Sequence, residues 1–168
     1  MRYSDALEFI RNEHTNVSKP GLDRISECLG LLKHPETTQN IIHVVGTNGK
    51  GSTAMMLTNT LVAAGYHVGT MISPALYDVK DYYRIDGKPI TEQQFIGAVE
   101  TLKSSFRIYD PDPTEFERAV AVALIMFKLE GCDFTILEAG MGGANDATNI
   151  GEGCLTVSAS NSYIVLRL

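Results

Sequence analysis

The chain has 168 residues, with 14 Lys or Arg against 20 Asp or Glu, so its formal net charge is −6. Its length is that of about one domain, and an apolar content of 44% with 20% charged residues excludes a disordered chain. No apolar run approaches the roughly 20 residues that cross a bilayer, and no Lys/Arg cluster could follow a nucleic-acid backbone. We therefore expect a cytoplasmic globular protein that binds neither membranes nor nucleic acid.

Two short helices are expected before the first strand. Apolar residues in 5–14 recur at helical spacing and predict the first helix. A turn at 18–21 separates it from a second predicted helix over 22–32, which ends near Pro35. A polar connector over 36–40 then leads to the first strand.

The middle of the chain predicts one strand–helix–strand unit. Residues 41–45 form a β-branched run that is typical of a buried strand. The glycine-rich segment 46–53 predicts a loop, 54–64 a helix, and 67–72 a second strand. Units of this kind build parallel sheets with right-handed crossovers, so we expect a parallel α/β fold.

The rest of the chain continues this alternation. Capping-box patterns beginning at Thr91 and Thr114 predict the starts of two helices. In chain order we predict a long exposed loop over 73–87, a helix over 92–108, a Pro-rich break over 110–113, a helix over 116–129, a strand over 133–137 that ends at Glu138, and a strand over 155–159.

Segment 46–53, GTNGKGST, is the most informative part of the sequence. Its glycines let the backbone turn tightly and present several N–H groups to an anion, and the following helix adds its positive N-terminal end. Lys50 would face the β- and γ-phosphates of a nucleotide, and Ser52 or Thr53 would offer a hydroxyl to Mg²⁺. Standard P-loop spacing requires Gly where Val44 stands, and Gly51 is inserted before the hydroxyl, so this is a variant. The alternative is a structural turn with an incidental lysine.

Glu138 is the natural partner of this loop. It ends an apolar strand, and ligands of open α/β sheets bind beyond the carboxyl ends of strands. Its carboxylate could ligate the same Mg²⁺ directly or through water. A solvated glutamate at a strand end is the alternative. A second glycine-rich turn follows, with Gly140, Gly142 and Gly143.

Cysteines and histidines suggest no further site. The cysteines are odd in number, widely spaced and without a CxxC pair, so we expect reduced thiols: Cys28, Cys132 and Cys154. The histidines lack metal-binding spacing, and we expect them to be ordinary core or surface residues: His14, His34, His43 and His67.

Taken in order, these motifs resemble the N-terminal part of the folylpolyglutamate synthase/dihydrofolate synthase family, within the Mur-ligase-like ATP-dependent amide ligases. Gly51 and the Ser73-Pro74 pair favour the folate branch over the cell-wall Mur ligases. The segments that carry the resemblance are KPGLDRI at 19–25, IHVVGTNGKGST at 42–53, Ser73-Pro74, IDG at 85–87, TEFE at 114–117, EAGMGG at 138–143 and DATN at 146–149.

The resemblance implies a three-layer, parallel-sheet, P-loop-type fold like the Mur ligase central domain. It implies that ATP phosphorylates the carboxylate of a folate or of dihydropteroate, and that the amine of L-glutamate then attacks the acyl phosphate. It further implies catalytic roles for Lys50 and Glu138, and Mg²⁺ ligation by Ser52 and Glu138. The residues that it places around the ATP phosphates are Thr47, Asn48, Gly49, Lys50, Gly51, Ser52 and Thr53, and those on the folate-side loop are Ser73 and Pro74.

The chain departs from the family pattern at several points. Ala75 stands where a His or bulky residue is common, Tyr82 where the family has the Arg of a Glu-Arg pair, and Ala144 where Arg is frequent. Residues 158–168 do not follow the pattern, and the family's later Asp-His pair, lysine and C-terminal ligase domain have no counterpart.

These departures define what we expect of the chain itself. We predict that 1–168 is the N-terminal portion of the ATP-binding domain, an incomplete fold with marginal stability and little or no ligase activity. The alternatives are another Mur-type amide ligase, or a nucleotide-binding remnant without catalysis. The sequence leaves open whether folate, dihydropteroate or both are substrates, and the resemblance implies a monomer for the full-length protein.

Overall fold

A computed structural model describes residues 1–11, 21–75, 78–106, 113–151 and 155–159. Several predicted features lie outside the described residues: Lys19, Pro20, Cys154, residues 110–112 of the Pro-rich break predicted over 110–113, and the tail from 160. In order, the elements are α1 (Tyr3–Arg11), α2 (Asp23–Leu31), the 3₁₀ turn η2 (Pro35–Thr38), β1 (Asn40–Val45), α3 (Lys50–Ala63), β2 (Val68–Met71), the 3₁₀ turn η3 (Val79–Tyr82), β3 (Tyr83–Ile85), β4 (Lys88–Pro89), α4 (Glu92–Ser105), α5 (Glu115–Leu129), β5 (Phe134–Glu138) and β6 (Leu155–Ser158).

The sheet is mixed rather than wholly parallel. Its strand order is β4-β3-β2-β5-β1-β6, and β2, β5, β1 and β6 run parallel, as predicted. The correction concerns β3 and β4, which pair antiparallel at one edge of the sheet. Both lie in or just after the segment that we predicted to be an exposed loop. They have three and two residues, too few for a strand period to show in the sequence.

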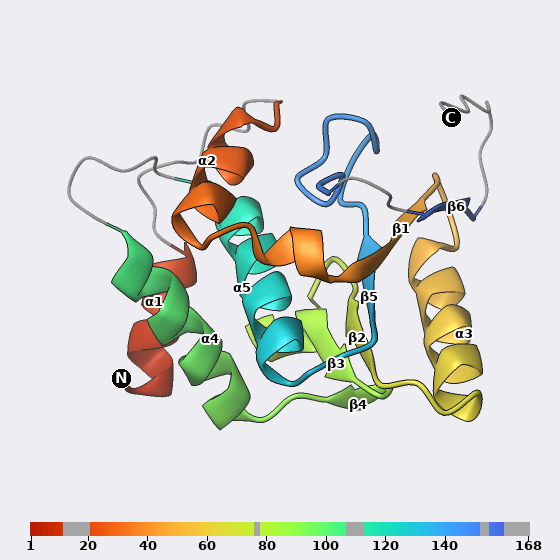
Figure 1. Cartoon of the computed structure of the whole chain (residues 1–168), viewed down its shortest axis with the longest axis horizontal. Coiled ribbons are helices and arrows are strands. Elements are labelled where there is room, and N and C mark those ends of the chain that lie inside the picture. Colours follow the sequence, from red (N-terminus) through yellow and green to blue (C-terminus); the bar gives the residue numbers. More distant parts are fainter. Residues whose placement is uncertain (12–20, 76–77, 107–112, 152–154, 160–168) are drawn as a thin grey trace.

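Helices cover the two faces of the sheet unequally, which gives the predicted three layers (Figure 1). On one face, α3 packs on a small apolar cluster that includes Val44 of β1 and Ile136 of β5. On the other face, α5 packs against the sheet, and α4, α1 and α2 pack around α5. All side chains of α5 from Glu117 to Phe127 are buried, so this helix forms the centre of the larger core.

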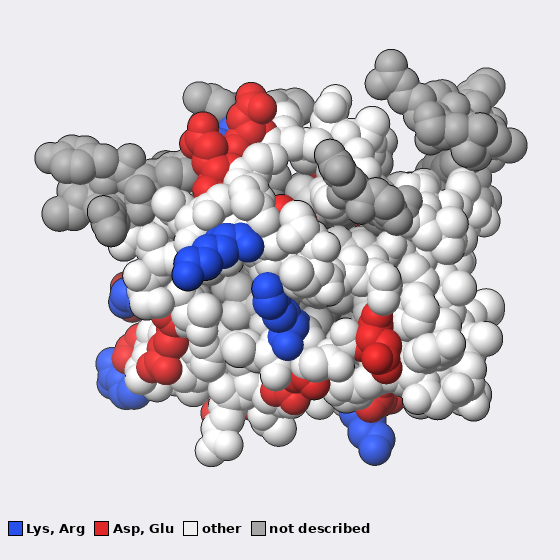
Figure 2. Space-filling view, viewed as in Figure 1, with Lys and Arg blue, Asp and Glu red and all other residues white. Residues whose placement is uncertain are grey.

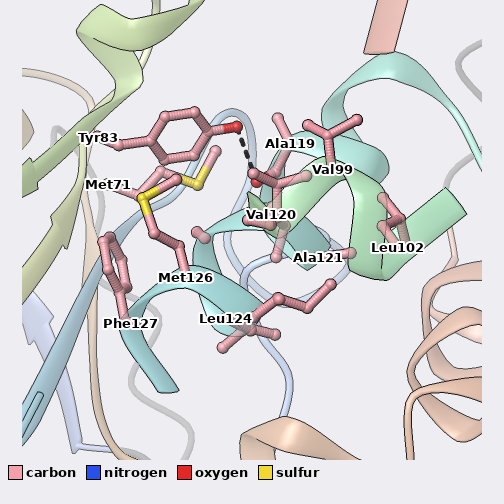
Figure 3. Packing of buried hydrophobic residues seen from close by; sticks show 14 of the residues in the cluster. Met71, Tyr83, Val99, Leu102, Ala119, Val120, Ala121, Leu124, Met126 and Phe127 are labelled. Atoms are coloured by element: carbon pink, nitrogen blue, oxygen red, sulfur yellow. Dashed lines mark hydrogen bonds between the residues drawn. The ribbon is translucent and has the colours of Figure 1, made fainter. Parts of the chain in front are cut away.

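Close packing between α5 and the sheet requires a glycine on β2. A Cβ built on Gly69 would lie 2.2 Å from the ring of Phe127. Nearby, the fully buried Tyr83 donates a hydrogen bond from its hydroxyl to the carbonyl of Ala119 at 3.1 Å (Figure 3). The buried Tyr83 therefore corrects our prediction that residues 73–87 form an exposed loop.

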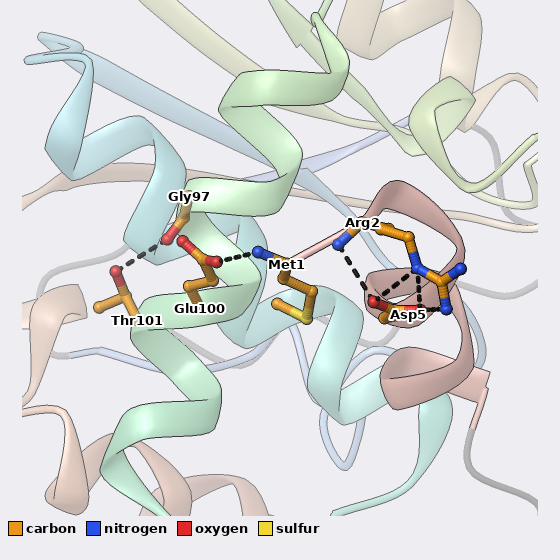
Figure 4. Close-up of polar contacts among 6 residues, drawn as sticks. All are labelled: Met1, Arg2, Asp5, Gly97, Glu100 and Thr101. Carbon is orange, nitrogen blue, oxygen red and sulfur yellow. Dashed lines mark hydrogen bonds and ion pairs between the residues drawn. The ribbon is translucent and has the colours of Figure 1, made fainter.

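Polar contacts fix the helix ends. The capping boxes predicted at Thr91 and Thr114 are both present. The amino group of Met1 donates to Glu100 of α4 at 2.7 Å and so ties the N-terminus to that helix (Figure 4). This contact joins the start of the chain to α4, and α1 and α4 pack side by side.

Charged side chains are interspersed on the molecular surface. On the face shown in Figure 2, Lys and Arg side chains lie among acidic and uncharged ones and form no broad basic patch. No helix in the described part of the chain is long and apolar enough to cross a membrane.

Candidate nucleotide-binding site

The glycine-rich loop joins β1 to α3 through residues in left-handed backbone conformations. Gly46 has φ 143° and Gly49 has φ 76°, values that side chains disfavour. Helix α3 begins at Lys50, earlier than the predicted start at residue 54, because Gly49 already acts as its N-cap. Residues 50–53 therefore form the first helical turn rather than a loop.

This helix start is suited to an anion. Gly49 has no side chain to cap the first amides of α3, and the first turn carries no acidic residue. Lys50 is half-buried at this end of the helix, and Ser52, two residues later in the same turn, is exposed. Thr47, Asn48 and Gly49 are exposed around the same loop. The predicted phosphate-contacting residues thus lie in the loop and the first helical turn that follow the carboxyl end of β1.

Glu138 meets this loop from the neighbouring strand. In the parallel pairing of β1 with β5, Glu138 lies opposite Val44, close to where β1 ends. A Cβ built on Gly51 would lie 3.4 Å from Oε2 of Glu138. The same oxygen accepts a hydrogen bond from the amide of Ser73 at 2.9 Å. Three distant segments of the sequence therefore converge on one carboxylate.

The environment of Glu138 makes its charge costly. The residue is only 4% exposed, and burial raises the pKa of the carboxyl group above its usual value. Three smaller contributions act to lower the pKa and so oppose the shift in part: the Ser73 amide, the Lys50 charge and the Gly51 backbone. A cation bound here would stabilise the carboxylate further, because an opposite charge compensates for the lost hydration.

Ser73 and Pro74, which we predicted on the folate-side loop, follow the end of β2. Ser73 is half-buried, and it is its backbone amide that reaches Glu138, whereas Pro74 is exposed. The peptide bond between these two residues is cis. Ser52 follows Gly51, the residue that approaches Glu138, in the first turn of α3.

The second glycine-rich turn is closed by Asp146. Its Oδ2 accepts from the amide of Met141 at 2.7 Å, and its Oδ1 accepts from both the amide and the hydroxyl of Thr148, at 3.0 and 2.5 Å. The Thr148 oxygen lies 2.8 Å from Nε2 of His43 on β1. Because the Thr148 proton goes to Asp146, the hydroxyl oxygen accepts from His43, which fixes the proton of the neutral ring on Nε2.

Sequence reasoning did not find this cluster of His43, Asp146 and Thr148. We expected His43 to be an ordinary core or surface residue, and it is a core one: it is 1% exposed and hydrogen-bonded, and burial lowers its pKa. An Asp two residues before a Thr is a typical turn-closing pattern, so the Asp146 end could have been suspected. No local signal pairs a histidine with a threonine 105 positions away.

No protein-family model matches the chain. The curated Bacillus subtilis "dihydrofolate synthase/folylpolyglutamate synthase" is 37% identical over 163 residues, which cover 94% of this chain and 38% of that protein. The Lacticaseibacillus casei folylpolyglutamate synthase is 30% identical over 89% of this chain and 36% of its own length. This chain is homologous to the folylpolyglutamate and dihydrofolate synthases.

Solved structures show the same relationship. A folylpolyglutamate synthase complex with AMPPCP and folate superposes with a TM-score of 0.86 at 30% identity, over 94% of this chain and 40% of that one. Escherichia coli FolC in complex with DHPP and ADP superposes with a TM-score of 0.84 at 33% identity, over 94% and 38% of the two chains. The predicted resemblance to these enzymes and the predicted α/β fold are therefore confirmed, and the chain spans less than half the length of these folylpolyglutamate synthase relatives.

Proposed function

We propose that this chain is the nucleotide-binding portion, from the N-terminal side, of an ATP-dependent ligase that joins L-glutamate to a folate or to dihydropteroate. One observation carries the proposal: the buried carboxylate of Glu138 meets the glycine-rich start of α3 at Gly51. The names of the relatives support the ligase, and solved complexes with AMPPCP or ADP support ATP as the nucleotide.

Phosphate binding would fall to the start of α3. Phosphoryl transfer needs mainly positioning and charge neutralisation, and uncapped helix amides supply fixed positive dipoles. The backbone from Thr47 to Thr53 would surround the phosphates, and Lys50 would stabilise the charge that develops on the transferring phosphoryl group.

A divalent cation fits the donors at this site. No group of three or more His, Cys, Asp or Glu side chains that could hold a metal occurs among the described residues. Mg²⁺ suits such a place, because it prefers oxygen ligands and commonly binds one or two carboxylates together with substrate phosphates and water. Glu138 and the hydroxyl of Ser52 would hold it, and the bound ion would neutralise phosphate charge.

The proposed reaction has two balanced steps. A carboxylate oxygen of the folate or dihydropteroate attacks the γ-phosphorus, and ADP leaves as the acyl phosphate forms. The glutamate nitrogen then attacks the acyl carbon, the C–N bond forms, phosphate leaves and the amine loses a proton. Ser73 and Pro74 would border the acid substrate, because the Ser73 amide contacts Glu138 next to the proposed phosphate site.

Titration of the 168-residue chain with AMPPCP tests the nucleotide site. We expect Mg²⁺-dependent binding, about tenfold weaker in Lys50→Ala because a charge-assisted contact is lost. Glu138→Gln should bind AMPPCP but lose most of the dependence on Mg²⁺. Lys128→Ala, at the far end of α5, is the matched control and should behave as wild type. Wild type that binds no AMPPCP would refute the proposal.

Ligation is a separate prediction from nucleotide binding. Glutamate-dependent release of ADP, assayed with a folate and in parallel with dihydropteroate, distinguishes the two acid substrates. We expect this chain to bind nucleotide with little or no turnover, and measurable ligation would contradict that expectation. We also propose a cytoplasmic location, which the unpaired, buried Cys28 supports, and a monomeric full-length protein, which its elution volume would check.

A further inference from the structure

Tyr82 contacts the chain on both sides of Ser73. The amide of Ile72 donates to the carbonyl of Tyr82 at 2.9 Å, next to the antiparallel pairing of β2 with β3. The phenol oxygen of Tyr82 is hydrogen-bonded to the backbone of Ala75. One residue therefore fixes the chain immediately before Ser73 and two positions after it.

The ring of Tyr82 is itself held in place. It is half-buried against the larger core, and its centroid lies 5.9 Å from that of Tyr83 at an interplanar angle of 54°. Tyr83 is fully buried and hydrogen-bonded to α5 through the Ala119 carbonyl. Because its neighbour is anchored in the core, Tyr82 offers the Ser73 segment a support with little freedom to move.

Ser73 links this support to the candidate metal site. Its amide donates to Oε2 of Glu138 at 2.9 Å, and Glu138 in turn touches the glycine-rich loop at Gly51. We propose that Tyr82 is a positioning residue, which holds the Ser73 amide on Glu138 and so keeps the carboxylate directed toward the Mg²⁺–nucleotide site. The effect of Tyr82 on metal binding rests on the function proposed above, whereas its support of the Ser73 segment does not.

Tyr82→Phe is the decisive variant, because it keeps the packed ring and removes only the phenol oxygen. The first measurement is hydrogen exchange at the Ser73 amide, with the amide of Thr70 in β2 as internal control against global unfolding. The second is the ratio of AMPPCP dissociation constants without and with Mg²⁺. Tyr66→Phe is the matched control, because Tyr66 is 47% exposed and packs edge-on against Phe134.

We expect Ser73 exchange to rise about fivefold in Tyr82→Phe, and the Mg²⁺ ratio to fall about fivefold, as for one lost hydrogen bond. AMPPCP affinity without Mg²⁺ should stay within about twofold, and Tyr66→Phe should change neither quantity. Unchanged exchange at Ser73 overturns the proposal, and so does raised exchange with an unchanged Mg²⁺ ratio. If wild type shows no Mg²⁺ dependence, the proposed function and the metal role of Tyr82 fail together, and Ser73 exchange still decides the loop contact.

Discussion

Replacing Thr148 by Val tests the buried hydrogen-bond chain that closes the second glycine-rich turn. Valine has nearly the shape of threonine, so the substitution removes a hydroxyl without opening a large cavity. Asp146 then loses one of its three hydrogen bonds, and the Nε2–H of His43 loses its acceptor. Thr148 is fully buried and His43 is 1% exposed, so water would not readily replace the hydroxyl.

The magnitude follows from the groups left unpaired. An unsatisfied buried donor costs about 1–3 kcal/mol, and loss of a hydrogen bond to a charged acceptor costs about 1.5–3 kcal/mol. Because the carboxylate of Asp146 keeps two amide donors, we expect Thr148→Val to lower the free energy of unfolding by about 2–4 kcal/mol. That is a large share of the roughly 5–15 kcal/mol of a typical domain.

Urea unfolding of matched variants measures this effect. Thr148→Ser keeps the hydroxyl and loses one methyl group, so it should cost only about 1 kcal/mol. In a His43→Leu background, Thr148→Val should cost clearly less than in wild type, because the histidine donor is already gone. A Thr148→Val protein within about 0.5 kcal/mol of wild type, with an unchanged m-value, would refute the hydrogen-bond chain.

Three further predictions concern pH, packing and capping. Burial lowers the pKa of His43, so as the pH falls below about 6.5 this histidine takes up a proton in the unfolded chain before it does so in the folded one. The free energy of unfolding should therefore decline by up to about 1.4 kcal/mol per pH unit in wild type, and less steeply in His43→Leu. Urea unfolding at each pH measures both slopes. In the same assay, Gly69→Ala should lower the free energy of unfolding by more than about 2 kcal/mol, because the new Cβ would overlap the ring of Phe127. Gly97→Ala in α4, where nothing lies within 4 Å of the new Cβ, should be neutral or stabilising. Equal effects of the two substitutions would contradict this packing. Thr114→Ala should lower the free energy of unfolding, measured by urea, by about 1 kcal/mol because the helix loses its N-cap. No change would mean that the capping box contributes nothing.

Short-range signals were sufficient for much of the fold and for part of the site. Capping boxes at Thr91 and Thr114, and a β-branched run before a glycine-rich turn, act within a few residues, so they are legible in a single sequence. The same holds for the candidate phosphate loop. Its helix begins at Lys50 rather than at residue 54, because the left-handed Gly49 lets the helix start inside the glycine-rich segment.

The sequence by itself determined the candidate residues, and the tertiary structure alone decided which of them meet. Glu138 reaches Gly51 because β5 pairs with β1 in parallel, and this long-range register has no local signature. The amide of Ser73 binds Glu138, although backbone donors leave no trace in residue identity. Chain packing likewise decided that His43 is a core rather than a surface histidine, and placed it in a buried hydrogen-bond chain. Such contacts depend on the position of the backbone in space, and only the folded chain fixes that position.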